Sequence, residues 1–470
     1  RSIAIGDSAL GAQNFTTATD SYNIAIGSGA GAAVTVGTIN TLIGGLAGDA
    51  LTTGDSNVAV GYVALSADTQ GDRSVAIGAG ALKTQNFTTA TSAYNIGIGY
   101  DAGASVTTGI QNTIVGALAG DALTDADFNV AIGIQALSGD TLGSGTTAVG
   151  TATLSSQNFT TATISYNTAL GYYAGASVTT GVQNTLLGGL AGDALTDADV
   201  NVAVGYGALS SAVTDGANTA VGAQALLNAN TGTATLSYNT AVGYNAGVAV
   251  TTGINNTIVG GLAGSVLTTG SVNTLVGKDA GDTLETGNNN VCIGNNVNTH
   301  HPNGSNQIVL GHDIQAIDNS YFSFGKASNV VSNQFAVDAS WSRSSDERLK
   351  KDITDSTLGL SFINDLRTVK YSWKASHELD STDAELAHLY KEDPADNQMD
   401  TGVYMHNFIA QEVKEALDTA GVSDFGGWNV DQYNVQQVSR EMFVIPLVKA
   451  VQELSAQVTA LTARIEALES

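Results

Sequence analysis

Apolar and polar residues alternate in a short motif that recurs along the first two thirds of the chain. An Asn is followed by a β-branched residue, a small or apolar residue, an aliphatic residue and Gly, as in NIAIG at residue 23 and NTAVG at residue 239. Successive closing glycines are separated by 21, 17, 17 and 17 residues, and this set repeats as a 72-residue super-unit. A period this short and regular predicts a stacked solenoid.

The positions within the repeat predict how each coil packs. The residue before the closing glycine is Ile, Val or Leu at all eighteen sites, and the residue two positions earlier is Ile, Val or Thr, as one face of a short β-strand requires. Ala commonly follows three residues after the glycine, as at Ala30 and Ala47, which indicates a narrow interior. The repeated asparagines are expected to stack and to bond through their side-chain amides along the rod. We therefore predict a mainly β fold, with a parallel β-solenoid or β-roll rod of 17-residue coils over residues 1–315.

Each 72-residue super-unit contains one coil of 21 residues. Three of these coils carry QNFTTAT, the fourth carries LNANTGTAT, and all four end in a Tyr directly before the Asn. Two interpretations stay open: the aromatic side chains form bulges that contact a receptor, since Tyr and Phe are favoured at interfaces, or they fill an enlarged corner. The candidate receptor-contact residues are Phe15, Tyr22, Phe87, Tyr94, Phe159, Tyr166 and Tyr238.

The chain changes character near residue 340. Five of the 17 basic residues lie before this point, and the other twelve lie between Arg343 and Arg464. Residues 316–340 read as a strand-rich bridge, and residues 341–470 as a small α+β domain. In that domain FINDLRTVKYSWK predicts a short helix and then a strand, and NFIAQEVKEAL predicts an amphipathic helix. Over residues 447–468, apolar residues at alternating spacings of four and three predict a coiled coil.

Composition narrows the classes of partner. The formal net charge of −26 argues against nucleic acid as a partner. The single Cys292 excludes an intrachain disulfide and a cysteine-based zinc site. The sequence contains no run of about eighteen apolar residues, the length that a membrane-spanning helix needs. We therefore expect no membrane insertion. Arg1 lies inside a repeat, and we expect the sequence to be a fragment that lacks an attachment region.

Two patterns are weak candidates for ion sites. GDALTDAD, at residues 120 and 192, places carboxylates at a loop corner but lacks the spacing of a known calcium loop, so a solvated turn is favoured. His300 and His301, with His312 beyond, are candidates to bind a metal ion on the rod axis. Adjacent residues of a strand point to opposite faces, which argues against a shared metal site. We expect no metal site and no cofactor.

The rod repeats, with coils such as SVAIG at residues 74–78, resemble the head repeats of trimeric autotransporter adhesins and similar repeats in bacteriophage tail fibres. The resemblance implies that three chains assemble side by side into a rod without a catalytic site. The repeat here is longer than is usual in the adhesin heads, so a single-chain parallel β-helix stays open as the alternative.

Four segments of the C-terminal region occur in an informative order: SDERLKKDI (345–353), VKYSW (369–373), FIAQEV (408–413) and IPLVKAVQEL (445–454). Together they resemble the intramolecular chaperone domain at the end of endosialidase-type phage tail spikes and fibres. Where that family often has Gly before FIAQEV, this chain has Asn407. The resemblance implies a domain that trimerises the nascent chain, assists folding of the rod and then cuts itself off.

The same resemblance implies that Ser345 is the nucleophile, that Lys350 is the base, and that the cut lies between Ser344 and Ser345. A serine hydroxyl needs a base to take its proton, and a lysine acts as one only if burial or nearby cations lower its pKa. Arg348 and Lys351 are the candidate cations, and Asp346 and Glu347 suit the amino end of a helix. The alternative use of these residues is a charged helix start that only forms ion pairs.

We therefore predict a phage tail fibre protein for host recognition, a homotrimer carried in the virion and synthesised in the host cytoplasm. Its partners would be a glycan or protein receptor on the host surface and other tail proteins. Its single enzymatic activity would be one turnover of a serine autoprotease. Two alternatives are a bacterial trimeric surface adhesin, which needs a membrane anchor, and a polysaccharide-degrading tail spike, which needs paired carboxylates in a groove.

Overall fold

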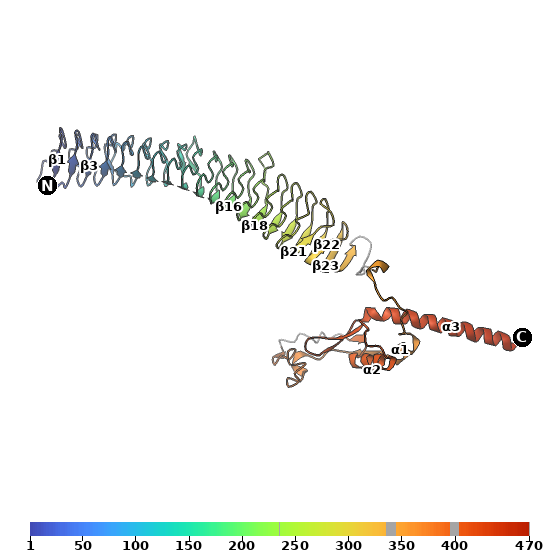
Figure 1. Ribbon diagram of the computed structural model, residues 1–470. Coiled ribbons are helices and arrows are strands. Elements are labelled where there is room, and N and C mark those ends of the chain that lie inside the picture. Colours follow the sequence, from blue (N-terminus) through green and yellow to red (C-terminus); the bar gives the residue numbers. More distant parts are fainter. Residues whose placement is uncertain (235, 335–344, 395–403, 470) are drawn as a thin grey trace. The chain divides into compact units, whose positions relative to one another are not determined.

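The computed structural model describes residues 1–234, 236–334, 345–394 and 404–469. The chain divides into two compact units, Arg1–Ser344 and Ser345–Ser470. The first unit is a stack of short strands and turns whose coils follow one another from the blue N-terminus to the yellow end of the rod (Figure 1). The mainly β solenoid that the sequence predicts is confirmed.

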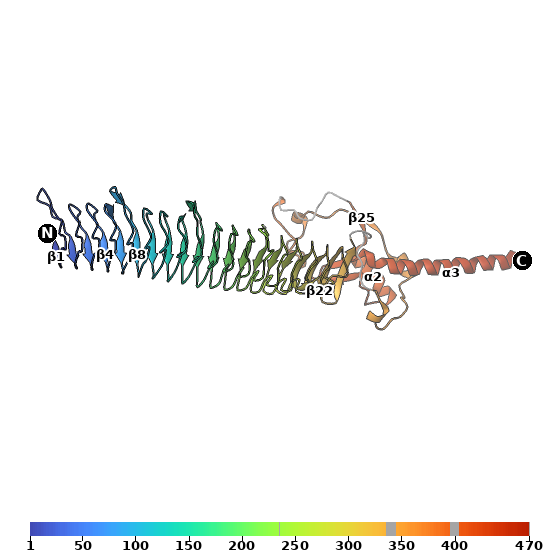
Figure 2. The same cartoon turned by 90° about the horizontal axis from the view of Figure 1, so that it is seen from above.

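Within the described residues, nineteen strands of the solenoid pair in parallel, each with the strand of the next coil. The strands line one side of the coils, and turns and loops form the rest (Figure 2). Their bounds are β1 Ile3–Ile5, β2 Ile24–Ile26, β3 Thr41–Ile43, β4 Val58–Val60, β6 Val75–Ile77, β8 Ile96–Ile98, β9 Thr113–Val115, β10 Val130–Ile132, β12 Thr147–Val149, β14 Thr168–Leu170, β15 Thr185–Leu187, β16 Val202–Val204, β17 Thr219–Val221, β18 Thr240–Val242, β19 Thr257–Val259, β20 Thr274–Val276, β21 Val291–Asn298, β22 Ile308–Gln315 and β23 Tyr321–Lys326.

Smaller strands complete the first unit. Two pairs, β5 Gly71–Asp72 with β7 Thr91–Ser92 and β11 Gly143–Ser144 with β13 Thr163–Ile164, stack the enlarged coils on their neighbours. Strand β24 (Asn329–Gln334) pairs antiparallel with β23. The predicted bridge therefore adds a further parallel strand to the solenoid and then a hairpin at its end.

The core of the solenoid is formed by the middle residue of each three-residue strand. In β3, for example, Leu42 is fully buried while Thr41 and Ile43 are partly exposed. The pattern recurs along the rod, so the Ile, Val and Leu residues before the glycines point outward. The sequence interpretation placed these residues on the packing face of the strand. In the single chain they lie on the outward face, so this interpretation is wrong. The alanines after the glycines, such as Ala30 and Ala47, are fully buried as expected.

The closing glycines allow the coils to stack closely. Their φ angles lie between +128° and +154°, a region that side chains disfavour. A Cβ atom on Gly188 would lie 2.6 Å from the carbonyl oxygen of Gly205 in the next coil. The repeat therefore requires glycine for both its backbone conformation and its contact distance.

The asparagines form the predicted ladder, but they bond mainly to the backbone. The Asn184 side-chain oxygen accepts from the backbone N–H of Asn201 at 3.0 Å, and its Nδ2 donates to the carbonyl of Ala198 at 2.8 Å. Direct amide-to-amide bonds occur in some coils, as from Asn290 to Asn273 at 3.0 Å. Each Asn thus satisfies two buried backbone groups of the following coil.

The second unit is a small α+β domain. It contains two antiparallel pairs, β25 Val369–Tyr371 with β26 Met405–Asn407 and β27 Trp428–Val430 with β28 Gln436–Val438. Its helices are η1 Glu347–Leu349, α1 Leu360–Asp365, η2 Ser376–Glu378, α2 Ala410–Ala420, η4 Arg440–Phe443 and α3 Val444–Glu469. Helix α3 extends away from the rest of this unit (Figure 1).

A compact apolar cluster holds the helices of the second unit together. Phe362 of α1, Val413 and Leu417 of α2 and Phe443 of η4 are buried in it. Helix α2 begins at Ala410, so Phe408 precedes the helix that was predicted to contain it and packs on Phe443 with ring centroids 4.9 Å apart. Glu453 of α3 accepts a hydrogen bond from the backbone N–H of Leu360 at 2.8 Å, which ties α3 to the start of α1.

Candidate functional site

The strongest candidate site lies at the first residues of the second unit. Lys350 Nζ donates to Ser345 Oγ at 2.8 Å. The two residues are five positions apart, and the 3-10 helix η1 between them turns the chain so that their side chains meet. The structure therefore brings together the two residues predicted to form the dyad.

The helix η1 has the acidic start that the sequence indicated. Asp346 is its N-cap and accepts from the backbone N–H of Arg348 at 2.9 Å. The Arg348 guanidinium also donates to both oxygens of Asp346, at 3.0 and 2.7 Å. This contact with Arg348 lowers the pKa of the Asp346 carboxyl and raises the pKa of Arg348.

The ion pair holds the Arg348 side chain against Asp346. The charge of Arg348 is neutralised by Asp346, so Arg348 is not a free cation beside Lys350. The Lys350 charge itself also lowers the pKa of Asp346, which places that carboxylate within electrostatic reach of the lysine. This pairing does not test the supporting role predicted for Arg348 beside Lys350, which stays a prediction.

The dyad is more exposed to solvent than proton transfer to Lys350 requires. Ser345 and Lys350 are both exposed in the single chain. A lysine ammonium donates hydrogen bonds and has no acceptor, so it takes a serine proton only after losing one of its own, which desolvation favours. The geometry of a dyad is present, and the desolvated environment is not. Ser344, the other side of the predicted scissile bond, lies outside the described residues.

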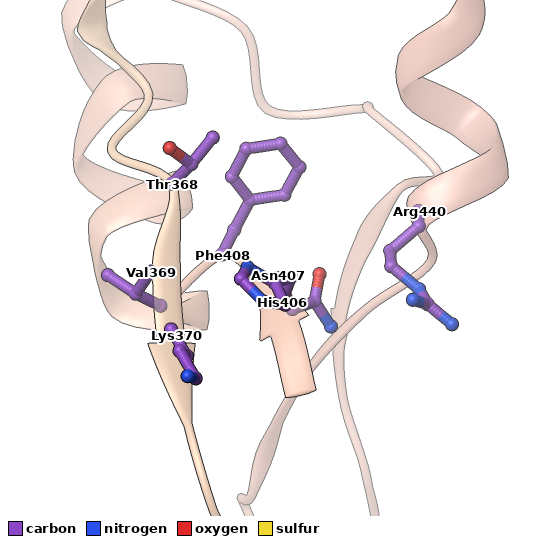
Figure 3. Close-up of a pocket in the computed structure, with 7 residues that line it drawn as sticks. All are labelled: Thr368, Val369, Lys370, His406, Asn407, Phe408 and Arg440. Atoms are coloured by element: carbon purple, nitrogen blue, oxygen red, sulfur yellow. The ribbon is translucent and has the colours of Figure 1, made fainter. Parts of the chain in front are cut away.

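A separate cavity in the second unit has a volume of about 380 Å³ and lies between β25, β26 and η4. Figure 3 shows Lys370 and His406 on the two paired strands and Arg440 across from them. The side-chain oxygen of Asn407, the position that departs from the family pattern, is buried without a hydrogen-bond partner among the described residues. Neither Ser345 nor Lys350 lines this cavity, so the dyad has no preformed substrate pocket there.

The aromatic side chains of the 21-residue coils differ in their exposure to solvent, which bears on whether they could contact a receptor. Phe87 and Phe159 are buried, and Phe15 is half-buried, so these rings fill the enlarged corner. Tyr22, Tyr94, Tyr166 and Tyr238 are exposed on the surface of the single chain. The receptor-contact interpretation therefore stays open for the tyrosines and is wrong for the buried phenylalanines.

The extra residues of the enlarged coils also repair the asparagine ladder, which sequence reasoning missed. At residue 146 the ladder position is Thr, whose Oγ1 shares a hydrogen bond of 2.6 Å with Ser165 Oγ of the next coil but lacks the amide of an asparagine. Gln157 donates to Thr146 Oγ1 at 3.0 Å and accepts from Asn167 at 2.8 Å. The same Gln donates to the buried Asp140 at 2.6 Å. Gln85 does the same beside Ser74, whereas Ala229 follows the intact Asn218. The pairing of a short ladder residue with a Gln eleven positions later was the available signal.

The weak ion-site candidates act as structural contacts. Asp127 accepts from the backbone N–H of Ile110 at 2.7 Å, and Asp125 accepts from Thr108 at 2.7 Å. His300 contacts Asp318 at 3.4 Å and shares a hydrogen bond with Gln307. Among the residues that the structure describes, no group of three or more His, Cys, Asp or Glu side chains could hold a metal ion. No described helix is long and apolar enough to cross a membrane.

Residues 345–422 match the family model described as chaperone of endosialidase. The match begins at Ser345, the first residue of the second compact unit. Searches of curated proteins and of solved structures found no match. Residues 345–422 are thus similar to the endosialidase chaperone family, and they follow a β-solenoid rod.

Proposed function

We propose that a chaperone domain of this family acts here as the removable assembly device of a phage tail fibre. In this proposal it aligns three chains, promotes folding of the β-solenoid and then separates from it between residues 344 and 345. The observation that carries the proposal is the 2.8 Å contact between Lys350 Nζ and Ser345 Oγ at the start of the family match. Non-local β-rods fold slowly and expose sticky edges, so a device that sets chain register lowers the barrier and suppresses aggregation.

The dyad can cut the chain in two steps, formation of an ester and its hydrolysis. Neutral Lys350 takes the proton of Ser345 Oγ, which attacks the carbonyl carbon of residue 344. The peptide C–N bond breaks, the proton passes to the leaving amine of Ser345, and an ester links the two parts. Water then hydrolyses the ester, which leaves a carboxylate on residue 344 and restores the Ser345 hydroxyl. One turnover is sufficient, because the substrate bond is part of the same chain.

Unpartnered apolar surfaces on both units support the assembly of copies. On the rod, the outward residues of the strands form a continuous aliphatic face, with Ile5 and Leu170 both more than half exposed. This face continues into a hollow lined by Leu310, Phe322 and Phe324. Exposed apolar areas of this extent mark interaction sites.

The seam of α3 is exposed as well. Its residues Leu447, Val451, Leu454, Val458, Leu461, Ile465 and Leu468 are all 49–80% exposed in the single chain. A lone helix with such a seam gains stability by pairing with copies of itself. Val and Ile alternating with Leu would by themselves favour two strands, so a trimer requires that the rest of the chain impose the number three.

The exposure of the dyad suggests an order of events. In the single chain both side chains of the dyad are exposed to water. Packing of three copies around η1 would remove water from the dyad and leave the lysine neutral for a larger fraction of the time. Cleavage would then follow assembly, and the separated rod would be kinetically stable because its register-setting partner has gone.

Denaturing gels of the full chain test this proposal. The wild type should yield a fragment comprising residues 345–470, and Ser345→Ala or Lys350→Ala should abolish it. Lys374→Ala is the control, an exposed lysine of the same unit that has no predicted role at the dyad, and this variant should still be cut. A wild-type chain that forms trimers and stays full length would remove the protease claim and leave the chaperone claim standing.

A second experiment separates assembly from cleavage. Leu461→Asp lies on the exposed seam, so it cannot disturb the fold of one chain, but it would place three carboxylates together in a coiled coil. This variant should sediment as a monomer and stay uncut, whereas Ala463→Asp, on the side of the same helix opposite the seam, should behave as the wild type. Full cleavage of a monomeric Leu461→Asp chain would contradict the proposed order of events.

A further inference from the structure

The residue directly after each closing glycine forms a column along the rod with a regular alternation. Over thirteen consecutive coils, large and small residues take turns without exception. The large ones are Tyr62, Tyr100, Ile134, Tyr172, Tyr206 and Tyr244, and the small ones are Gly45, Ala79, Ala117, Thr151, Gly189, Ala223 and Gly261. We call the five tyrosines the tyrosine column.

The alternation has a steric cause. Coils are about 4.8 Å apart, which is less than the width of a phenol ring that leans along the rod. A Cβ atom on Gly45 would lie 3.5 Å from the Tyr62 ring, and one on Gly189 would lie 3.7 Å from the Tyr206 ring. Each of these rings therefore rests over the small residue of the preceding coil. The small residues keep the rings of the column apart from one another, and Tyr172 also packs against Tyr173, with ring centroids 4.4 Å apart.

The tyrosine column is accessible, uncharged and free to bond. Its five side chains are 59–62% exposed in the single chain, a narrow range for residues spread over 182 positions of sequence. Within the part of the chain that the structure describes, no hydrogen bond engages their hydroxyl groups. No residue of the column between Gly45 and Gly261 carries a charge. Core packing accounts for none of these features.

We propose that the tyrosine column binds a linear, uncharged polysaccharide that lies along the rod. This inference rests on the proposed function and names the class of surface that the fibre would recognise. Neighbouring tyrosines are separated by two coils, about 9.6 Å, or by a multiple of it. A polymer with a repeating unit can present the same sugar face to every ring, whereas the surface of a globular protein without repeats does not.

The chemistry of tyrosine fits this ligand. The ring face is apolar and slightly negative, so it packs against the C–H face of a sugar ring, and the hydroxyl can donate to or accept from a sugar hydroxyl. The absence of charge in the column and the net charge of −26 favour an uncharged polymer over an acidic one. A second copy of the chain is the competing occupant, because Tyr is also common at protein interfaces.

Exposed apolar residues at the other end of the strands provide a matched control. Tyr172→Ala/Tyr244→Ala removes two rings of the column. Phe128→Ala/Ile39→Ala removes two side chains that are 57% and 58% exposed and that precede strands β10 and β3. Binding of the full chain is measured by affinity electrophoresis in gels that contain dextran, laminarin or galactomannan, with alginate as the acidic probe.

We expect retention by at least one of the uncharged polysaccharides and none by alginate. The column variant should bind about tenfold more weakly, as two lost aromatic contacts imply, while the control variant binds as the wild type. Tyr172→Phe/Tyr244→Phe, which keeps the rings, should retain most of the binding. Size and cleavage of every variant are followed on the same samples.

Several results would overturn the proposal. These are no retention by any of the uncharged polysaccharides, equal loss in the control variant, or loss of trimers in the column variant, which would assign the column to an interface between copies. A chain that assembles and cleaves normally but does not bind would refute the polysaccharide alone. A chain that neither assembles nor cleaves would refute the proposed function instead.

Discussion

Replacing one ladder asparagine should open the solenoid locally. Asn184 is fully buried, accepts from the backbone N–H of Asn201 and donates to the carbonyl of Ala198. Asn184→Ala would leave both backbone groups buried without partners. An unsatisfied buried group costs about 1–3 kcal/mol, so the pair costs about 2–6 kcal/mol.

The loss should be confined to the coils around the substitution. In a solenoid each coil contacts only its neighbours, so the defect lowers the free energy of local opening rather than that of the whole rod. A loss of about 3 kcal/mol corresponds to roughly a hundredfold faster hydrogen exchange. The effect should appear in peptides that contain β15 and β16 and be absent from peptides that contain β19.

Hydrogen exchange measured by mass spectrometry on the assembled chain tests this expectation. Thr185→Ala is the control, since Thr185 is the next residue but points outward from β15. Exchange in β16 that stays within about threefold of the wild type would refute the reasoning, because the orphaned groups would then have found other partners. Equal acceleration in the Thr185→Ala chain would refute it as well, by showing that any change in this coil opens it.

Three further outcomes are expected. Gly188→Ala, whose Cβ would lie 2.6 Å from the Gly205 carbonyl oxygen at a φ of +134°, should lower the thermal midpoint by several degrees, whereas Gly261→Ala, with nothing within 4 Å, should leave it nearly unchanged; equal midpoints would contradict the close stacking of glycines. Gln157→Ala should destabilise its coil, because it removes the donor to the buried Asp140 Oδ2 and one of the two acceptors of the Asn167 amide, and hydrogen exchange around β14 measures this; an effect no larger than that of Asn158→Ala would show that the ladder tolerates the gap. Burial raises the pKa of Asp49, Asp121 and Asp193 above the ordinary value of 3.8, so these groups bind a proton more tightly in the folded rod; the stability they contribute is full below that value and is lost as the pH rises through their raised pKa. The triple Asp→Asn chain should therefore be more stable than the wild type at neutral pH, and its thermal midpoint should rise less than that of the wild type on acidification. Thermal midpoints of the two chains that shift by the same amount with pH would contradict this.

The architecture could be predicted because the repeat is visible directly in the sequence. Eighteen glycines at set spacings can be explained only by a structural unit repeated at those spacings, and each one marks the end of a strand. Ser345 and Lys350 were found through the resemblance to a family, since a serine with a lysine five residues later is common by chance. The structure adds that a three-residue helix, capped by Asp346, brings the two side chains within 2.8 Å.

Other features could not be predicted, because they depend on distances between coils. A strand of alternating residues has two apolar faces when its middle residue is Ala or Leu and its flanks are Ile or Val, and only the closed coil decides which face is inside. The narrow interior accepts the middle residue, so the flanking residues lie outside. The role of Gln157 was hidden for the same reason, since its partners are 11, 17 and 10 residues away and meet only in the stacked coils.

The sequence by itself determined the solenoid, the length of its coils, the point near residue 340 where the chain changes character and the heptad seam. These follow from periodicity, which is a local property that the linear chain displays directly. Only the tertiary structure decided that the outward face of the rod is aliphatic, that Phe87 and Phe159 are buried, that Arg348 is paired with Asp346, and that five tyrosines stand clear of one another along one column. These are decided by packing, in which a side chain's surroundings come from residues a full coil away.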